Sequence, residues 1–185
     1  MQELSPIGWA LRPLKNYARF SGRASRAEFW WFFLFMMIIY SVFWVVLFGT
    51  IGITAAASES QNPVAMMGAF GVIGIFMVLF YLALLIPTIA VQIRRLHDTN
   101  RSGWWLGAFW LLYLVYMVGS FGLAFSATSE NPTPNLGSAG LMMIFGLAFF
   151  VYSIVLLVFF CLRGTQGPNR FGDDPYGANV EEVFA

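Results

Sequence analysis

Four long apolar runs without a charged side chain place the strongest constraint on how this chain can fold. They cover residues 29–53, 66–92, 104–125 and 140–162, and none of them contains Asp, Glu, Lys or Arg. About 20 apolar residues are enough for a helix to cross the hydrocarbon core of a bilayer. Charged residues make up only 10% of the chain, whereas soluble domains contain about a quarter. The sequence therefore predicts an all-α, polytopic membrane protein with four transmembrane helices.

The remaining residues divide the chain into three parts. We expect an amphipathic segment at 1–25, a four-helix transmembrane domain at 26–162 and a turn-rich tail at 163–185. The amphipathic segment is expected either to lie along the membrane interface or to pack on the helix bundle as a cytoplasmic cap. In the first part, Ser5 and Pro6 have the pattern of an N-cap followed by proline at the first helical position. Pro13 is expected to divide this segment into two short helices.

A capping box marks the start of the first span. Ser25 precedes Arg26-Ala27-Glu28, the spacing at which a serine hydroxyl and a glutamate carboxylate each accept a hydrogen bond from the other residue's backbone N–H. We therefore assign Ser25 and Glu28 as the structural cap of this helix.

The distribution of charge predicts the orientation in the membrane. All ten Lys and Arg residues fall within residues 1–28, within the loop at 94–101 or within the tail. Positively charged segments remain on the cytoplasmic side of the membrane. Both termini and the central loop are therefore predicted to be cytoplasmic.

The two halves of the sequence share a weak pattern. Arg23 and Ser25 precede the pair Trp30-Trp31, and Arg101-Ser102 precede the pair Trp104-Trp105. Each half then continues with a span, a polar loop that contains Glu and Asn-Pro, and a second span. The pattern suggests two similar helical hairpins in the same orientation, although matches this short can also arise by chance.

Three short blocks resemble those of a known family. Residues 20–30 (FSGRASRAEFW), 94–105 (RRLHDTNRSGWW) and 164–175 (GTQGPNRFGDDP) are similar to the signature blocks of the YhaH-like bacterial inner-membrane proteins, which are catalogued as a domain of unknown function, number 805 in its series. Phe171 stands where the family commonly has tyrosine. The resemblance covers nearly the whole chain and implies a small multi-span protein of the inner (plasma) membrane, but it implies no activity.

The three blocks supply most of the charged side chains on the predicted cytoplasmic side. One interpretation is a binding site for an anionic group, because arginine side chains form paired hydrogen bonds with phosphate or carboxylate. The other is that the arginines only fix the topology and pair with nearby carboxylates. The candidate site consists of Arg23, Arg26, Arg94, Arg95, His97, Asp98, Arg101, Asn169 and Arg170.

Other kinds of site find little support. His97 and Asp98 suggest acid–base chemistry, but neighbouring residues rarely point at the same atom and no nucleophile accompanies them. Cys161 is expected to be a small buried apolar residue. We expect no catalytic residue and no cofactor. We also expect no metal site, because one His and one Cys cannot supply the three protein ligands that zinc needs. The tryptophans at 30, 31, 104 and 105 are expected to be interface anchors.

Three functional hypotheses follow. The first is a non-enzymatic inner-membrane protein whose basic cytoplasmic face binds anionic lipid headgroups or a partner protein. The second is a small-solute or ion pore formed by a homo-oligomer. The third is an enzyme that acts on a lipid or phosphate group at the cytoplasmic interface. Proton-coupled transport is disfavoured because the spans contain no ionisable Asp, Glu, Lys, Arg or His. We expect no nucleic-acid partner.

Overall fold

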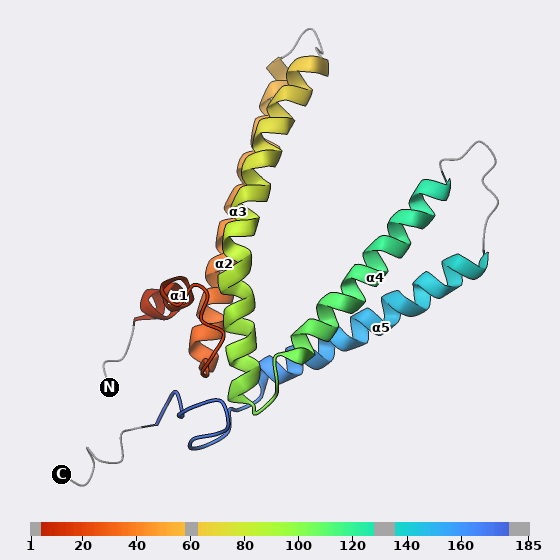
Figure 1. The fold of residues 1–185 in the computed structure, drawn as a ribbon. Coiled ribbons are helices and arrows are strands. Elements are labelled where there is room, and N and C mark those ends of the chain that lie inside the picture. Colours follow the sequence, from red (N-terminus) through yellow and green to blue (C-terminus); the bar gives the residue numbers. More distant parts are fainter. Residues whose placement is uncertain (1–4, 58–62, 128–135, 178–185) are drawn as a thin grey trace. The chain divides into compact units, whose positions relative to one another are not determined.

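The computed structural model describes residues 5–57, 63–127 and 136–177. Five helices occur in these ranges, and no strand does (Figure 1). They are α1 (Pro6–Lys15), α2 (Arg26–Ala57), α3 (Pro63–Asp98), α4 (Trp104–Ala127) and α5 (Leu136–Cys161).

Four of these helices are long and apolar enough to cross a membrane. The candidate spans are Arg26–Thr50, Gly71–Asp98, Trp104–Ser126 and Gly137–Cys161, with 25, 28, 23 and 25 residues respectively. Each exceeds the length of about 20 residues that a crossing requires. The predicted all-α class with four apolar spans is therefore confirmed.

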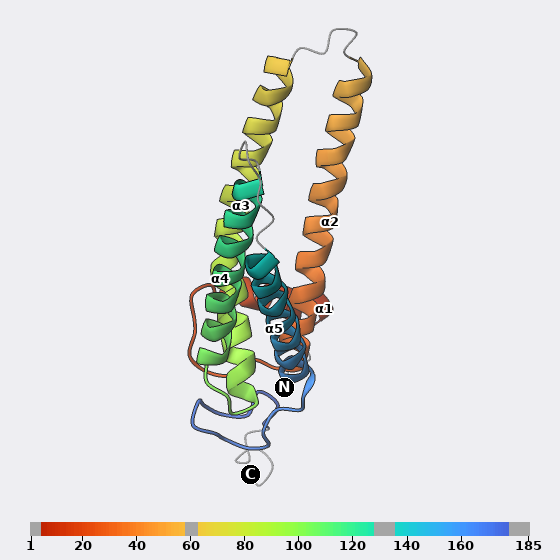
Figure 2. The same ribbon diagram turned by 90° about the vertical axis from the view of Figure 1, so that its right-hand side faces the viewer.

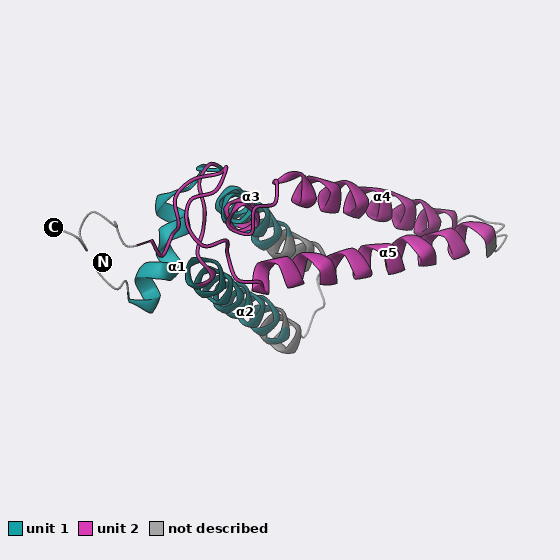
Figure 3. Cartoon of the chain, turned by 90° about the horizontal axis from the view of Figure 1, so that it is seen from below, with its two compact units in different colours: residues 1–20, 27–91 teal, residues 21–26, 92–185 magenta. Residues whose placement is uncertain are grey.

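The chain forms two compact units, coloured separately in Figure 3. The first unit comprises Met1–Phe20 and Ala27–Val91, and the second comprises Ser21–Arg26 and Gln92–Ala185. The first therefore holds α1 and nearly all of the α2–α3 hairpin. Figure 2 shows these two helices running antiparallel to each other. The second holds residues 21–26, the end of α3, the α4–α5 hairpin and the tail after α5. Whether the two hairpins are similar stays a prediction.

In the first unit, α1 begins as its sequence predicts. The Ser5 hydroxyl accepts a hydrogen bond from the backbone N–H of Gly8 at 3.2 Å, and Pro6 is the first helical residue. The expected break at Pro13 is wrong, since α1 continues through it to Lys15. A proline inside a helix removes one hydrogen bond and crowds the carbonyl four residues earlier, but its fixed φ is helical. The helix ends two residues later, so a single lost bond near its end is tolerated.

In the second unit, α4 and α5 pack against each other through aromatic rings. The Phe149 ring on α5 lies 5.0 Å from that of Phe109 and 6.1 Å from that of Tyr116, both on α4. Nearer the ends of the spans, the Tyr152 hydroxyl donates to the Trp105 carbonyl at 2.8 Å. Lipid tails are as apolar as these side chains, so close packing and hydrogen bonds hold such helices together rather than the hydrophobic effect.

The end of α5 corrects one expectation. Cys161 is exposed rather than buried. Its neighbour Phe160 is buried, with 8% of its surface accessible. Adjacent helical residues point about 100° apart, so Phe160 can face inward while Cys161 does not.

Candidate functional site

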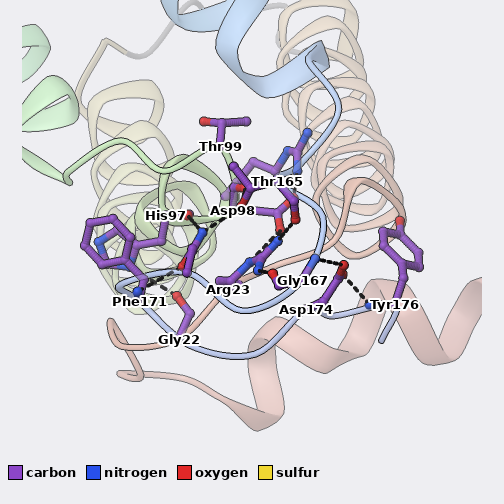
Figure 4. A network of polar contacts seen from close by, with 12 residues as sticks. Gly22, Arg23, His97, Asp98, Thr99, Thr165, Gly167, Phe171, Asp174 and Tyr176 are labelled. Atoms are coloured by element: carbon purple, nitrogen blue, oxygen red, sulfur yellow. Dashed lines mark hydrogen bonds and ion pairs between the residues drawn. The ribbon is translucent and has the colours of Figure 1, made fainter. Parts of the chain in front are cut away.

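Three segments that are far apart in the sequence meet in a polar network in the second unit. They are residues 21–26, the end of α3 with the loop that follows it, and the tail after α5. Figure 4 shows this network at close range. These segments are the three blocks singled out in the sequence.

Asp98, the last residue of α3, lies at the centre of the network. One carboxylate oxygen accepts from Arg23 Nε at 2.9 Å, and the other accepts from Arg95 Nη1. The side chains of Asp98, Arg23 and Arg95 are only 2%, 1% and 0% exposed. Removing three charges from water costs several kcal/mol per ion, and only close pairing and complete hydrogen bonding compensate for that cost.

Backbone carbonyls accept further hydrogen bonds from the two arginines. Arg95 donates from Nε to the Phe160 carbonyl at 3.1 Å and from Nη2 to the Leu162 carbonyl. Arg23 donates to the carbonyls of Thr165 and Gly167. The last carbonyls of a helix have no partner within it and carry partial negative charge. Arg95, on α3, therefore caps the C-terminal end of α5.

The tail after α5 caps the end of α3 in return. The Thr165 backbone N–H donates to the Asp98 carbonyl at 2.9 Å, and the Thr165 hydroxyl donates to the same carbonyl at 3.2 Å. The Asn169 side chain donates to the His97 carbonyl at 3.0 Å and accepts from the Phe171 N–H at 2.9 Å. The backbone contributes as well, because Arg101 N–H donates to the Leu96 carbonyl at 2.9 Å. Arg95 on α3 thus binds carbonyls at the end of α5, and the tail after α5 binds carbonyls at the end of α3.

His97 stacks on the tail instead of facing Asp98. Its ring lies parallel to that of Phe171, with the centroids 3.9 Å apart. Its Nδ1 lies 3.1 Å from the Gly22 carbonyl, which can only accept, so Nδ1 carries the proton. With both oxygens of Asp98 taken by arginines, the adjacent His and Asp do not form a hydrogen-bonded dyad.

Other arginines of the second unit lie at the surface. We call them the peripheral arginines: Arg26, Arg101, Arg163 and Arg170. All four are exposed except Arg101, which is half-buried with its guanidinium 3.8 Å above the Phe159 ring. Arg170 donates to the Asn100 carbonyl at 3.1 Å. Two of them lie next to a span, since Arg26 begins α2 and Arg163 follows α5 by two residues.

The remaining predicted site and cap residues are buried. Arg94 is 4% exposed, and its carbonyl accepts from the Ala24 N–H at 3.0 Å. Ser25 and Glu28 are buried, and α2 begins between them at Arg26. Their reciprocal hydrogen bonds stay a prediction.

The tryptophans predicted as interface anchors differ in their surroundings. On α4, Trp104 is 83% exposed, whereas Trp105 is 39% exposed and meets the Phe159 ring edge-to-face at 5.1 Å. On α2, Trp31 is 39% exposed and Trp30 contacts the ring of Phe33. Exposed tryptophan near the end of an apolar span is typical of an interface anchor.

Two tail residues were not chosen as site residues from the sequence. Thr165 caps α3, as described above. Gly164 lies so close to Asp98 that a Cβ there would be 2.2 Å from Oδ2 of the carboxylate. The signal for both was present, because they open the third signature block. Nothing in that block alone indicated which atoms they would contact.

No group of three or more His, Cys, Asp or Glu side chains suited to a metal ion occurs among the described residues. The network is instead dominated by arginine donors bound to carbonyl and carboxylate acceptors. The network holds three separate segments of the chain together, and the peripheral arginines lie at its surface.

The chain is similar to proteins of the bacterial inner membrane. A family model described as "Protein of unknown function (DUF805)" matches residues 17–173. The chain is 33% identical to the inner membrane protein YhaI of Escherichia coli K12 over 172 residues, which are 92% of this chain and 98% of that protein. It is 32% identical to the inner membrane protein YhaH of the same strain over 169 residues, or 91% and 97% of the two chains. No solved structure matches.

Proposed function

The chain belongs to the DUF805 family of proteins of unknown function, and on that premise we propose that it is a non-enzymatic inner-membrane protein whose peripheral arginines bind anionic lipid headgroups. Its relatives are inner membrane proteins, and its four apolar helices are long enough to span a bilayer. The proposal includes a cytoplasmic location for both termini and for the 94–101 loop, based on the positions of all ten Lys and Arg residues.

The observation that carries the proposal is the exposure of three arginines at or beyond the ends of the spans. Arg26, Arg163 and Arg170 are exposed, whereas Arg23 and Arg95 are already bound to Asp98. A basic side chain near an anionic membrane surface gains about 1 kcal/mol. Arginine also offers a planar set of donors that matches a phosphate group.

No described contact supports the other hypotheses in the same way. An enzyme would need a reactive group, and His97 and Asp98 are occupied by contacts with Gly22 and the two arginines. The proposal therefore assigns the chain no reaction. A partner protein that is bound by the same arginines is an outcome that the experiment below distinguishes.

The test compares wild type with the triple variant Arg26→Gln/Arg163→Gln/Arg170→Gln. The full chain is purified in mild detergent and titrated with phosphatidylglycerol or phosphatidylcholine, and native mass spectrometry counts the retained lipids. Three charges at about 1 kcal/mol each predict a loss of roughly a hundredfold in phosphatidylglycerol affinity at low salt. Retention of phosphatidylcholine should not change.

Arg12→Gln is the matched control, because Arg12 already lies 3.6 Å from the Glu28 carboxylate and should contribute little. Equal phosphatidylglycerol retention by wild type and the triple variant would contradict the proposal. A co-purifying protein that is lost only from the triple variant would favour the partner hypothesis instead. Substitution of Arg94 or Arg95 is unsuitable here, because both are buried.

A further inference from the structure

Pro87 leaves one carbonyl of α3 without its usual partner. In an α-helix the N–H of each residue donates to the carbonyl four positions earlier. Proline has no N–H, so the carbonyl of Ala83 loses the bond that residue 87 would otherwise supply. Ala83 lies within the candidate span Gly71–Asp98, and helices that cross a membrane satisfy such freed carbonyls with neighbouring groups.

The hydroxyl of Tyr17 fills this position. It donates to the Ala83 carbonyl, across 66 residues of sequence. Tyr17 follows the end of α1 by two residues, and the Asn16 side chain and backbone both bond to the Arg12 carbonyl. The ring is therefore held by a short turn fixed to α1.

A second contact joins α1 to the other helix of the same hairpin. Arg12 Nε lies 3.6 Å from the Glu28 carboxylate in the first turn of α2, and the Glu28 side chain is 1% exposed. Ala10 and Pro13, on the same helix, are buried. Thus α1, beside the beginning of α2 in Figure 1, contacts α2 through Arg12, and the turn that follows it contacts α3 through Tyr17.

We propose that α1 is a strap that holds α2 and α3 together, and that its fastening point is the Ala83 carbonyl left open by Pro87. The proline creates a docking point for one hydroxyl, and Tyr17 supplies that hydroxyl. The proposed bond controls the conformation of α1. With the bond in place α1 is held on the hairpin, and without it α1 detaches more often. It depends only on contacts within the first unit and not on lipid binding.

A double-mutant cycle tests this pairing. Wild type, Tyr17→Phe, Pro87→Ala and the double variant are studied as full chains in phosphatidylcholine nanodiscs, and hydrogen exchange is measured for the amides of α1. One intramolecular hydrogen bond corresponds to roughly a three- to tenfold change in an opening equilibrium. Tyr17→Phe should therefore speed exchange in α1 by about that factor. In the Pro87→Ala background it should have little effect, since the substituted alanine supplies the missing N–H.

Tyr152→Phe is the matched control. It removes a hydroxyl that donates to a backbone carbonyl in the second unit and should leave exchange in α1 unchanged. The proposal is overturned if Tyr17→Phe has no effect on α1, if Tyr152→Phe has the same effect, or if Tyr17→Phe acts equally in both Pro87 backgrounds. Should Pro87→Ala fail to fold, Arg12→Gln provides a second measurement. It should also speed exchange in α1, and unchanged exchange would count against the strap.

Discussion

At the scale of single residues, Asp98 determines whether the three polar segments can meet. Its carboxylate is the only anion that Arg23 and Arg95 contact within the network described above. Removing one member of a buried charge network leaves the others without compensation, and such losses usually cost about 3–5 kcal/mol. The positions around Asp98 should consequently tolerate little change.

The first prediction concerns the charge of Asp98. Asp98→Asn keeps the size of the side chain but leaves two buried guanidinium groups without an anion, so the free energy of unfolding should fall by about 3–5 kcal/mol. Unfolding by SDS in mixed micelles measures the change. Asp173→Asn, at an exposed position in the tail, is the control and should change it by less than about 0.5 kcal/mol. Equal stabilities of the two variants would show that Asp98 does not hold the network.

The second prediction concerns Gly164. A Cβ at this position would lie 2.2 Å from one Asp98 oxygen and 2.6 Å from its Cγ. The carboxylate is held by two arginines and cannot easily move aside, so Gly164→Ala should reduce stability by about 1–3 kcal/mol, as overpacking typically does. Gly49→Ala is the control, because no heavy atom lies within 4 Å of a Cβ there. Thermal unfolding midpoints compare the pair, and similar midpoints would rule out the clash.

At the scale of helices, one ring makes several of the contacts between α4 and α5. Phe149 contacts the rings of Phe109, Tyr113 and Tyr116 on α4. Between apolar helices in lipid, such packing replaces the hydrophobic effect as the source of affinity. The hairpin should therefore be sensitive to loss of this ring and insensitive to changes on its outer face.

The third prediction makes that comparison between neighbouring residues. Phe149→Ala removes three ring contacts, each worth about 0.5–1.5 kcal/mol, and should lower the free energy of unfolding measurably. Phe150→Ala removes the same group from a position that is 61% exposed and should have a much smaller effect. SDS titration of both variants, followed by tryptophan fluorescence, gives the two values. An equal loss would mean that the α4–α5 contact does not depend on Phe149.

At the scale of the whole molecule, the proposed topology can be tested directly. In a Cys161→Ser background, a cysteine at position 59 or 130 should react with a membrane-impermeant maleimide added to intact cells. A cysteine at position 102 should react only after the cells are opened. The prediction follows from the absence of Lys and Arg in the two outer loops. Labelling of residue 102 from outside would reverse the orientation.

Much of the fold could be predicted because hydropathy is a local property. Each of the four spans can be identified from its own residues, and the Ser5 cap of α1 from three neighbouring positions. The predicted helix break at Pro13 and the predicted burial of Cys161 are wrong, because both depend on the position of the residue in its helix. Pro13 lies two residues from the end of α1, where one missing bond costs little, and Cys161 points away from the buried side of α5 that Phe160 occupies.

By itself the sequence determined the class of protein, its four spans and the confinement of its basic residues to the segments outside them. Only the tertiary structure decided which arginines are available. In the sequence, Arg23 and Arg26 are similar residues three positions apart, yet Arg23 is bound to Asp98 and Arg26 is exposed. The physical reason is the range of the interactions. Membrane insertion depends on the summed hydropathy of consecutive residues, whereas the burial of Arg23 depends on hydrogen bonds to groups 75, 142 and 144 residues away.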